Sequence, residues 1–155
     1  MIHYIKSNLF DILNNLDTHK KYYIIHSCNC MAKWGAGFAL KLKQLFPESY
    51  EIYKQSCNSD KIGSALIIST KYDNVFIVCL FVSNKYGYLK DEPTKILLNT
   101  QISINDMMTK IDLQNAILCS PKINSGLFNV PWIETEELIT KNIIIKNIDW
   151  FVYVL

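Results

Sequence analysis

The chain has 155 residues, of which 16 are basic and 14 acidic, so its formal net charge is +2. Half of the residues are hydrophobic and 19% are charged, which excludes an intrinsically disordered chain because enough apolar surface is available to form a core. With only 5 Gly and 4 Pro, the composition also excludes a collagen-like or low-complexity protein. We therefore expect residues 1–155 to form a single globular domain.

Six stretches have the strand signature of alternating or β-branched and aromatic residues. Three other stretches have the apolar spacing of helices: one carries a stripe from Phe38 to Phe46 that Pro47 interrupts or ends, one runs from Pro93 to Ile111, and one begins near Pro131. Alternating strands and helices with apolar inner strands predict an α/β fold, in which helices cover a mixed or parallel sheet. The predicted strands are residues 2–6, 22–25, 64–70, 75–82, 116–119 and 150–154, with a turn at 72–74.

The location follows from what the chain lacks. The longest uninterrupted apolar run, Val75 to Val82, has 8 residues, whereas a membrane-spanning helix needs about 20. The N-terminus has neither the basic head nor the apolar core of a secretory signal. The five cysteines are odd in number and several lie in apolar runs, which favours reduced thiols over a disulfide framework. We expect a cytoplasmic protein, with the nucleus as a second compartment and no membrane partner.

All 16 basic residues are lysine, so a bidentate arginine clamp on phosphate is excluded. An anion site in this chain must therefore use backbone N–H groups, helix N-termini or lysine. The near-neutral charge and the lack of a basic run also argue against direct nucleic-acid binding.

Two loops follow predicted strands and lead into predicted helices, the position at which α/β folds bind ligands. The first, His26 to Gly37, holds Gly35 and Gly37 at a helix start, where unpaired N–H groups can cradle a phosphate. Glycine pairs at helix starts are also common as simple turn formers, so this spacing is weak evidence alone. The second loop, Pro121 to Trp132, contains a further turn at Asn124-Ser125-Gly126. Together the loops favour a nucleotide or phosphosugar ligand.

His26 is predicted to end its strand at the rim of this cleft, where an imidazole can act as acid, base or nucleophile. A structural histidine at a strand end is the simpler reading. His26, Cys28 and Cys30 also form an HxCxC cluster, but a structural zinc site needs four ligands and no second pair has ligand spacing, so we expect no metal and no cofactor. Nothing in the sequence marks either thiol as an activated nucleophile.

The two loops resemble those of the macro domain family, the ADP-ribose-binding α/β modules. Within the family the chain is similar to the fungal-type ADP-ribose-1''-phosphate phosphatases, and the similarity covers essentially the whole sequence. The residues that carry it are Ile25 to Cys30, Trp34 to Gly37, Phe46-Pro47-Glu48 with Tyr50, Cys79-Leu80-Phe81, Ile123 to Phe128, Val130-Pro131-Trp132, Glu134-Thr135-Glu136 and Phe151 to Leu155.

The resemblance implies a three-layer α/β/α fold with a mixed central sheet and a cleft for ADP-ribose or ADP-ribose 1''-phosphate. It implies that His26 carries phosphatase chemistry and that Asn29, counted with it as catalytic, bonds the distal ribose. Many family members have Asp where Asn8 stands, which puts adenine selectivity in question. The implied substrate-binding residues are Asn8 and Leu9 near adenine, Trp34, Gly35, Ala36 and Gly37 along the distal ribose and phosphates, Ile123, Asn124, Ser125, Gly126, Leu127 and Phe128 around the diphosphate, and Tyr153 beside adenine.

Three functions remain open from the sequence. The leading hypothesis is a phosphatase acting on ADP-ribose 1''-phosphate, a by-product of tRNA splicing, with Lys33 as an auxiliary charge or merely a solvated residue. The second is a hydrolase that removes ADP-ribose from modified protein carboxylates. A related branch uses lysine with an aspartate, but Phe128 stands at the aspartate position and only Lys85 lies near the lysine position. The third is a non-catalytic reader of free or protein-linked ADP-ribose. Trp34 and Phe128 are candidates to close over the ligand, whereas Trp132 and Trp150 are expected in the core.

Overall fold

The structure, a computed structural model, describes all 155 residues. Three short 3₁₀ helices, Leu9–Asn14, Ser59–Lys61 and Gly87–Leu89, lie between the main elements. The strands are β1 (Ile2–Lys6), β2 (Lys21–Asn29), β3 (Ala65–Ser69), β4 (Val75–Ser83), β5 (Ala116–Ser120) and β6 (Trp150–Val154), and the helices are α1 (Gly37–Leu45), α2 (Pro47–Ser56), α3 (Pro93–Lys110) and α4 (Trp132–Lys146).

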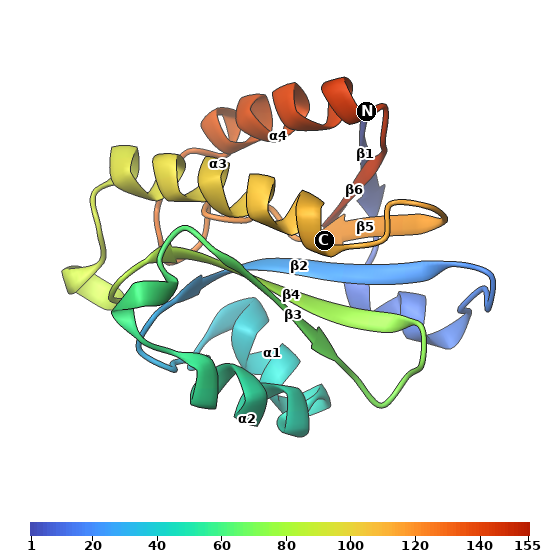
Figure 1. Cartoon of the computed structure of the whole chain (residues 1–155), viewed down its shortest axis with the longest axis horizontal. Coiled ribbons are helices and arrows are strands. Elements are labelled where there is room, and N and C mark those ends of the chain that lie inside the picture. Colours follow the sequence, from blue (N-terminus) through green and yellow to red (C-terminus); the bar gives the residue numbers. More distant parts are fainter.

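The strands form one six-stranded sheet in the order β1-β6-β5-β2-β4-β3. All neighbouring strands are parallel except β3 and β4, which form an antiparallel pair. Helices α3 and α4 cover one face of the sheet, and α1 and α2 cover the other (Figure 1). This arrangement confirms the predicted three-layer α/β/α fold with a mixed central sheet.

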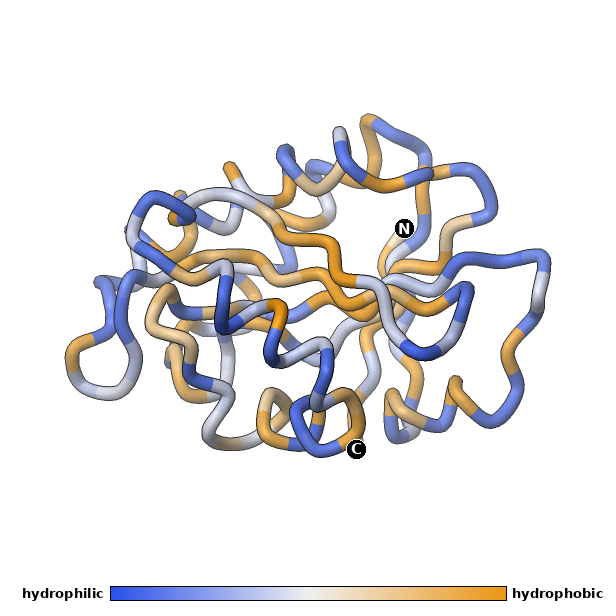
Figure 2. The backbone as a smooth tube through the Cα atoms, turned by 60° about the horizontal axis from the view of Figure 1, so that its bottom comes forward, coloured by the Kyte–Doolittle hydropathy of each residue, from blue (hydrophilic) through white to orange (hydrophobic).

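Each face of the sheet has its own hydrophobic core. On β2, Tyr23 and Ile25 belong to the core beneath α3 and α4, whereas Ile24 and Cys28 belong to the core beneath α1 and α2. Successive residues of a strand point to opposite faces, so His26 lies on the α1/α2 face with Ile24 and Cys28. Figure 2 shows the hydrophobic strands in the middle of the molecule, with hydrophilic segments outside them. None of the helices is both long and apolar enough to cross a lipid bilayer.

The sequence-based elements were recovered with two differences. Helix α2 was not predicted, because its ten residues bury only Ser49 and Tyr53 and show no apolar stripe. Pro47 ends α1 and also begins α2, as a residue favoured in a first helical turn. Strand β2 extends to Asn29, beyond the predicted end at Ile25. The extension follows from pairing with β4, which continues to a bulge between Cys28 and Asn29.

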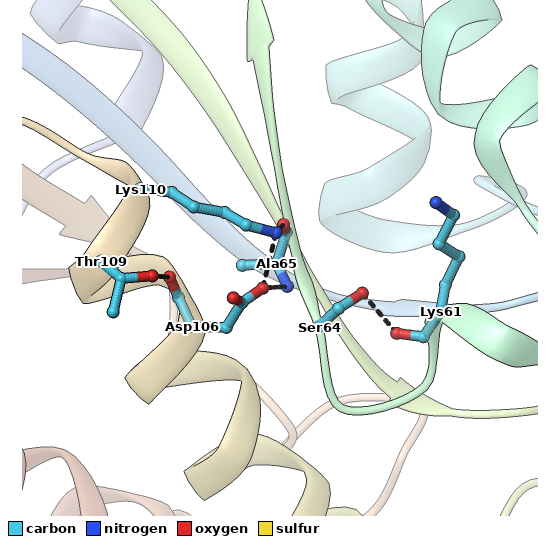
Figure 3. A network of polar contacts seen from close by, with 6 residues as sticks. All are labelled: Lys61, Ser64, Ala65, Asp106, Thr109 and Lys110. Atoms are coloured by element: carbon cyan, nitrogen blue, oxygen red, sulfur yellow. Dashed lines mark hydrogen bonds and ion pairs between the residues drawn. The ribbon is translucent and has the colours of Figure 1, made fainter.

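A polar network ties strand β3 to the end of helix α3 (Figure 3). One carboxylate oxygen of Asp106 accepts a 2.8 Å hydrogen bond from the backbone N–H of Ala65 and lies 2.7 Å from Nζ of Lys110. Lys110 also donates to the carbonyl oxygen of Ala65 at 2.8 Å. Burial alone would raise the pKa of Asp106, but the hydrogen bond and the lysine outweigh it, and the pKa is lowered from its usual value.

We expect Asp106→Ala to lower the free energy of unfolding by about 1 to 2 kcal/mol at pH 7, because the N–H of Ala65 loses its partner. A carboxyl group with a lowered folded-state pKa stabilises the protein above its unfolded-state pKa, near 3.9, and this contribution is lost as the pH falls through the folded-state value. In urea denaturation, the difference in the free energy of unfolding between wild type and Asp106→Ala should therefore become smaller below pH 4. Asp73→Ala, in the exposed β3–β4 turn, is the control; an equal loss there would contradict this role of Asp106.

Candidate ligand-binding site

A cavity of about 870 Å³ opens between the loops that follow β2 and β5. The pairing of β2 with β5 ends at Ile24 and Cys119, whereas β2 continues to pair with β4. One side of β2 is therefore free of a neighbouring strand beyond Ile24, and the cavity lies there. The volume is within the range of small-molecule sites. Thirteen of the predicted residues line it: His26, Asn29, Trp34, Gly35, Ala36, Gly37, Ile123, Asn124, Ser125, Gly126, Leu127, Phe128 and Tyr153.

Asn8 and Leu9 do not line the cavity. The side-chain oxygen of Asn8 caps the first 3₁₀ helix by accepting a 3.0 Å hydrogen bond from the backbone N–H of Phe10. The Leu9 side chain is buried in the α1/α2 core. We expected both residues beside a ligand, but neither lines the cavity, because Asn8 caps a helix and Leu9 packs in the core.

Tyr153, by contrast, does line the cavity, and burial raises its pKa.

Asn29 holds the first loop in shape. Its Oδ1 accepts hydrogen bonds from the backbone N–H groups of Met31 and Lys33, at 2.9 and 3.3 Å, and its Nδ2 donates to the carbonyl oxygen of Lys33 at 2.9 Å. The hydroxyl of Tyr53 lies 2.7 Å from the Asn29 carbonyl oxygen and 3.1 Å from Oδ1. An amide nitrogen has two hydrogens, so one remains for a ligand. The predicted ribose contact stays a prediction, and the loop-building role is one that the sequence did not indicate.

The loop ends at the start of α1, where Gly37 has a φ of +57°. The preceding residue, Ala36, offers no side chain to cap the helix. The first N–H groups of a helix have no partner within it, so this end presents donors and a partial positive charge beside the cavity. The geometry confirms that the second glycine of the predicted loop begins a helix.

We expect Gly37→Ala to cost about 1 kcal/mol of stability, because an L-residue is strained at positive φ. Nothing lies within 4 Å of the added Cβ, so crowding contributes nothing. Gly126→Ala is a matched control, since Gly126 also has open space and its φ is not in the left-handed region. Thermal denaturation compares the two variants. Equal stability losses would show that the backbone conformation at Gly37 is not the cause.

Trp34 lies beneath the loop and does not close over the cavity from above. Its side chain is 1% exposed and stacks on Tyr53 with a 4.8 Å centroid separation. Its ring centroid also lies 5.4 Å from that of Tyr50 and 4.9 Å from that of His26, and the His26 and Trp34 rings form a T-shaped pair. The prediction that Trp34 closes over the ligand is therefore wrong. The aromatic residues of α2 hold the indole in the core, and the sequence analysis did not predict that helix.

The second loop is supported by buried residues and exposes its tip. Asn124 is 4% exposed, has a φ of +67°, and donates to the hydroxyl oxygens of Thr100 and Thr135 at 3.0 and 3.2 Å. Its Oδ1 accepts a 2.6 Å hydrogen bond from Ser27. Asn124 and the buried Ile123 thus anchor the loop, whereas Leu127 at its tip is 73% exposed. Phe128 is half-buried and packs against the α3/α4 core.

The prediction that His26 ends its strand is wrong. His26 lies within β2, opposite Cys79 of β4, and is 3% exposed. The prediction erred because it ended the strand where the apolar run ends, at Ile25. His26 still reaches the cavity, since it is among the lining residues.

The charges around the cavity are asymmetric. Lys33 and Lys122 are exposed and line it, whereas no Asp or Glu side chain does. Lys85, the only candidate for a lysine mechanism, is exposed and does not line the cavity. Burial raises the pKa of Cys30 to about 12 and holds the pKa of Cys28 well above its usual range. Both thiols are thus unsuited to nucleophilic attack, as the sequence indicated.

Comparison with known proteins decides the family. A sequence profile described as "Macro domain" matches residues 25–139. The chain belongs to the macro domain family. This macro domain is 34% identical to the ADP-ribose 1''-phosphate phosphatase of Candida albicans, with all of both chains covered. It is 32% identical to the protein of the same name from Debaryomyces hansenii, with 91% of this chain and 93% of the relative covered.

Solved structures agree on the fold. The macrodomain of Mycobacterium tuberculosis DarG has a TM-score of 0.77 at 19% identity, with 100% of this chain and 98% of that chain covered. The complex of Thermosipho africanus DarTG with ADP-ribose has a TM-score of 0.76 at 13% identity, and covers 99% of this chain and 41% of that chain. At these identities the likeness concerns the fold alone.

Proposed function

We propose that this macro domain hydrolyses the 1''-phosphate monoester of ADP-ribose 1''-phosphate to give ADP-ribose and inorganic phosphate. The two fungal relatives have this activity in their names, and their similarity extends over nearly the full length of both chains. The proposal includes the wider setting that the family resemblance implies: a substrate from tRNA splicing, in the cytoplasm or nucleus. ADP-ribosylated proteins are a further candidate partner.

The observation that supports the proposal best is the set of polar groups around the cavity. His26 is its only imidazole, Lys33 and Lys122 bring positive charge, and no Asp or Glu side chain repels a phosphate dianion. Phosphoryl transfer depends mainly on positioning and on stabilising negative charge, which backbone N–H groups and lysines can supply without arginine.

In this proposal, separate groups bind the phosphates, bind the distal ribose and transfer the proton. The N-terminal turn of α1 and the second loop hold the phosphates of the nucleotide through backbone N–H groups. The free Nδ2 hydrogen of Asn29 is available to the distal ribose. His26 gives a proton to the departing sugar oxygen, or orients the attacking water; covalent attack by the imidazole is the remaining alternative.

One observation favours a second candidate, a non-catalytic reader of ADP-ribose. His26 is almost fully buried, and its Nε2 lies 3.3 Å from Sγ of Cys28 and 3.7 Å from Sγ of Cys79. A ring nitrogen that faces two thiols has restricted access to a phosphate. The lysine-dependent hydrolase has no such support, because Lys85 does not line the cavity and the family resemblance places Phe128 where that branch has aspartate.

The test is phosphate release from ADP-ribose 1''-phosphate by the purified protein, with p-nitrophenyl phosphate as a substrate that lacks the nucleotide. ADP-ribose binding is measured in parallel by thermal shift: ligand at 100 times its Kd adds about 2.7 kcal/mol, or roughly 5 to 10 °C for a chain of this size. Phosphate release from ADP-ribose 1''-phosphate but not from p-nitrophenyl phosphate supports the proposal. A thermal shift without phosphate release would overturn the proposal and leave the reader and the hydrolase, which release of ADP-ribose from a modified protein would separate.

A further inference from the structure

Three potential metal ligands meet on one face of the sheet, and two of them line the cavity. They are Nε2 of His26 and Sγ of Cys28, both on β2, and Sγ of Cys79 on β4. All three side chains are buried, with exposures of 3%, 2% and 0%. The sheet register explains the meeting: Cys79 lies opposite His26, and Cys28 is two residues further along the same face.

The separations between these atoms are those of ligands around one metal ion. Nε2 of His26 lies 3.3 Å from Sγ of Cys28 and 3.7 Å from Sγ of Cys79, and all three atoms lie within 4.8 Å of one another. Such a triangle has a point roughly 2.1 to 2.4 Å from every corner, which coincides with zinc–nitrogen and zinc–sulfur bond lengths.

The chemistry of the three atoms selects the kind of ion. Sulfur and imidazole ligands suit zinc and other thiophilic cations, whereas magnesium and calcium prefer oxygen. Two thiolates and one neutral imidazole would balance the charge of a divalent ion, which favours binding at a buried position. Both His26 and Cys28 line the cavity, so a fourth coordination position can open toward water or a phosphate oxygen.

The geometry disfavours a disulfide bond between Cys28 and Cys79. Cys28 lies opposite Phe81 while Cys79 lies opposite His26, so the two cysteines are diagonal neighbours across the strand pair. With strands about 4.8 Å apart and a rise of about 3.3 Å per residue, the Cα atoms of such diagonal residues lie about 8 Å apart. A disulfide rarely bridges more than about 7 Å without backbone movement.

We propose that His26, Cys28 and Cys79 form a binding site for one thiophilic divalent cation of the zinc type. Each thiol gives its proton to solvent as its sulfur–metal bond forms. Cys30, two residues beyond Cys28 in the sequence, is not part of the cluster, whose third member is the distant Cys79. If the proposed phosphatase activity is correct, a bound ion also occupies Nε2 of His26 and removes it from proton transfer.

The first test is titration of the purified metal-free protein with Co²⁺, whose spectrum reports thiolate and tetrahedral ligation. We expect saturation at one equivalent, with sulfur-to-cobalt charge-transfer bands that Zn²⁺ abolishes by displacement. Cys79→Ser should lose these bands. Cys119→Ser is the matched control, because Cys119 is equally buried on the same face but outside the cluster, and it should retain them.

Circular dichroism of each variant establishes that it is folded, and Cys28→Ser provides a second variant if Cys79→Ser is not. Absence of stoichiometric binding to the wild type would overturn the proposal, as would equal charge-transfer intensity in folded Cys79→Ser. Neither readout depends on catalysis. Inhibition of phosphate release by one equivalent of Zn²⁺, reversed by a chelator, tests the link to His26 separately, so a failure of the proposed activity leaves the metal result intact.

Discussion

His26→Gln should reduce kcat for phosphate release from ADP-ribose 1''-phosphate by about 10² to 10⁴-fold, the usual contribution of a positioned acid or base. Glutamine preserves much of the ring's volume in a tightly packed position between Trp34 and Phe38, but it cannot exchange a proton near neutral pH. The Kd for ADP-ribose should change less than threefold, since the loops supply the contacts to the nucleotide. Steady-state kinetics and ligand-induced thermal shift measure the two quantities.

Two controls make the result specific. Lys85→Ala removes an exposed lysine outside the cavity and should keep full phosphate release. A loss of phosphate release in this variant would instead give Lys85 a part in the reaction. Unfolding of His26→Gln in urea separates a chemical defect from a folding defect. Wild-type kcat in a folded His26→Gln protein would remove the imidazole from the mechanism and leave the lysines and backbone N–H groups as the catalytic groups.

The parts of the site that were predicted from the sequence are those with local signals. Gly35 and Gly37 mark a turn into a helix, and the Asn124-Ser125-Gly126 turn follows an apolar strand; the structure places both loops at the same cavity. Local patterns are sufficient here because parallel strands direct their carboxyl ends, and hence the loops that follow them, to one edge of the sheet.

The parts that escaped prediction depend on contacts between distant residues. Trp34 becomes a core residue only because Tyr53 of α2 stacks on its ring and Tyr50 of α2 packs against it at a tilt. Likewise, Cys79 joins Cys28 through the register of β2 with β4, and sequence spacing gives no measure of that register. The HxCxC spacing therefore did not identify Cys79 as a member of the buried cluster that holds His26 and Cys28.

Asn124→Ala should lower the free energy of unfolding by about 2 to 4 kcal/mol. The change removes the side-chain partner of three hydroxyl groups, from Ser27, Thr100 and Thr135, in a region where water has little access. It also places a Cβ-bearing residue without a compensating amide at a φ of +67°, a conformation that asparagine tolerates better than alanine. Urea denaturation at pH 7 gives the loss.

Asn124→Gly separates the two causes, because glycine is unstrained at positive φ but has no amide, and it should recover about 1 kcal/mol of the loss. Ser125→Ala, in the next residue of the same loop, is the control: its hydroxyl bonds only the carbonyl oxygen of Lys122 on the partly exposed surface, and its removal should cost less than about 0.5 kcal/mol. If Asn124→Ala and Ser125→Ala were equally stable, the buried network would not hold the loop. If instead Asn124→Ala is destabilised and binds ADP-ribose more weakly, this residue supports the site by positioning Ser125 to Phe128, with its own amide directed into the core.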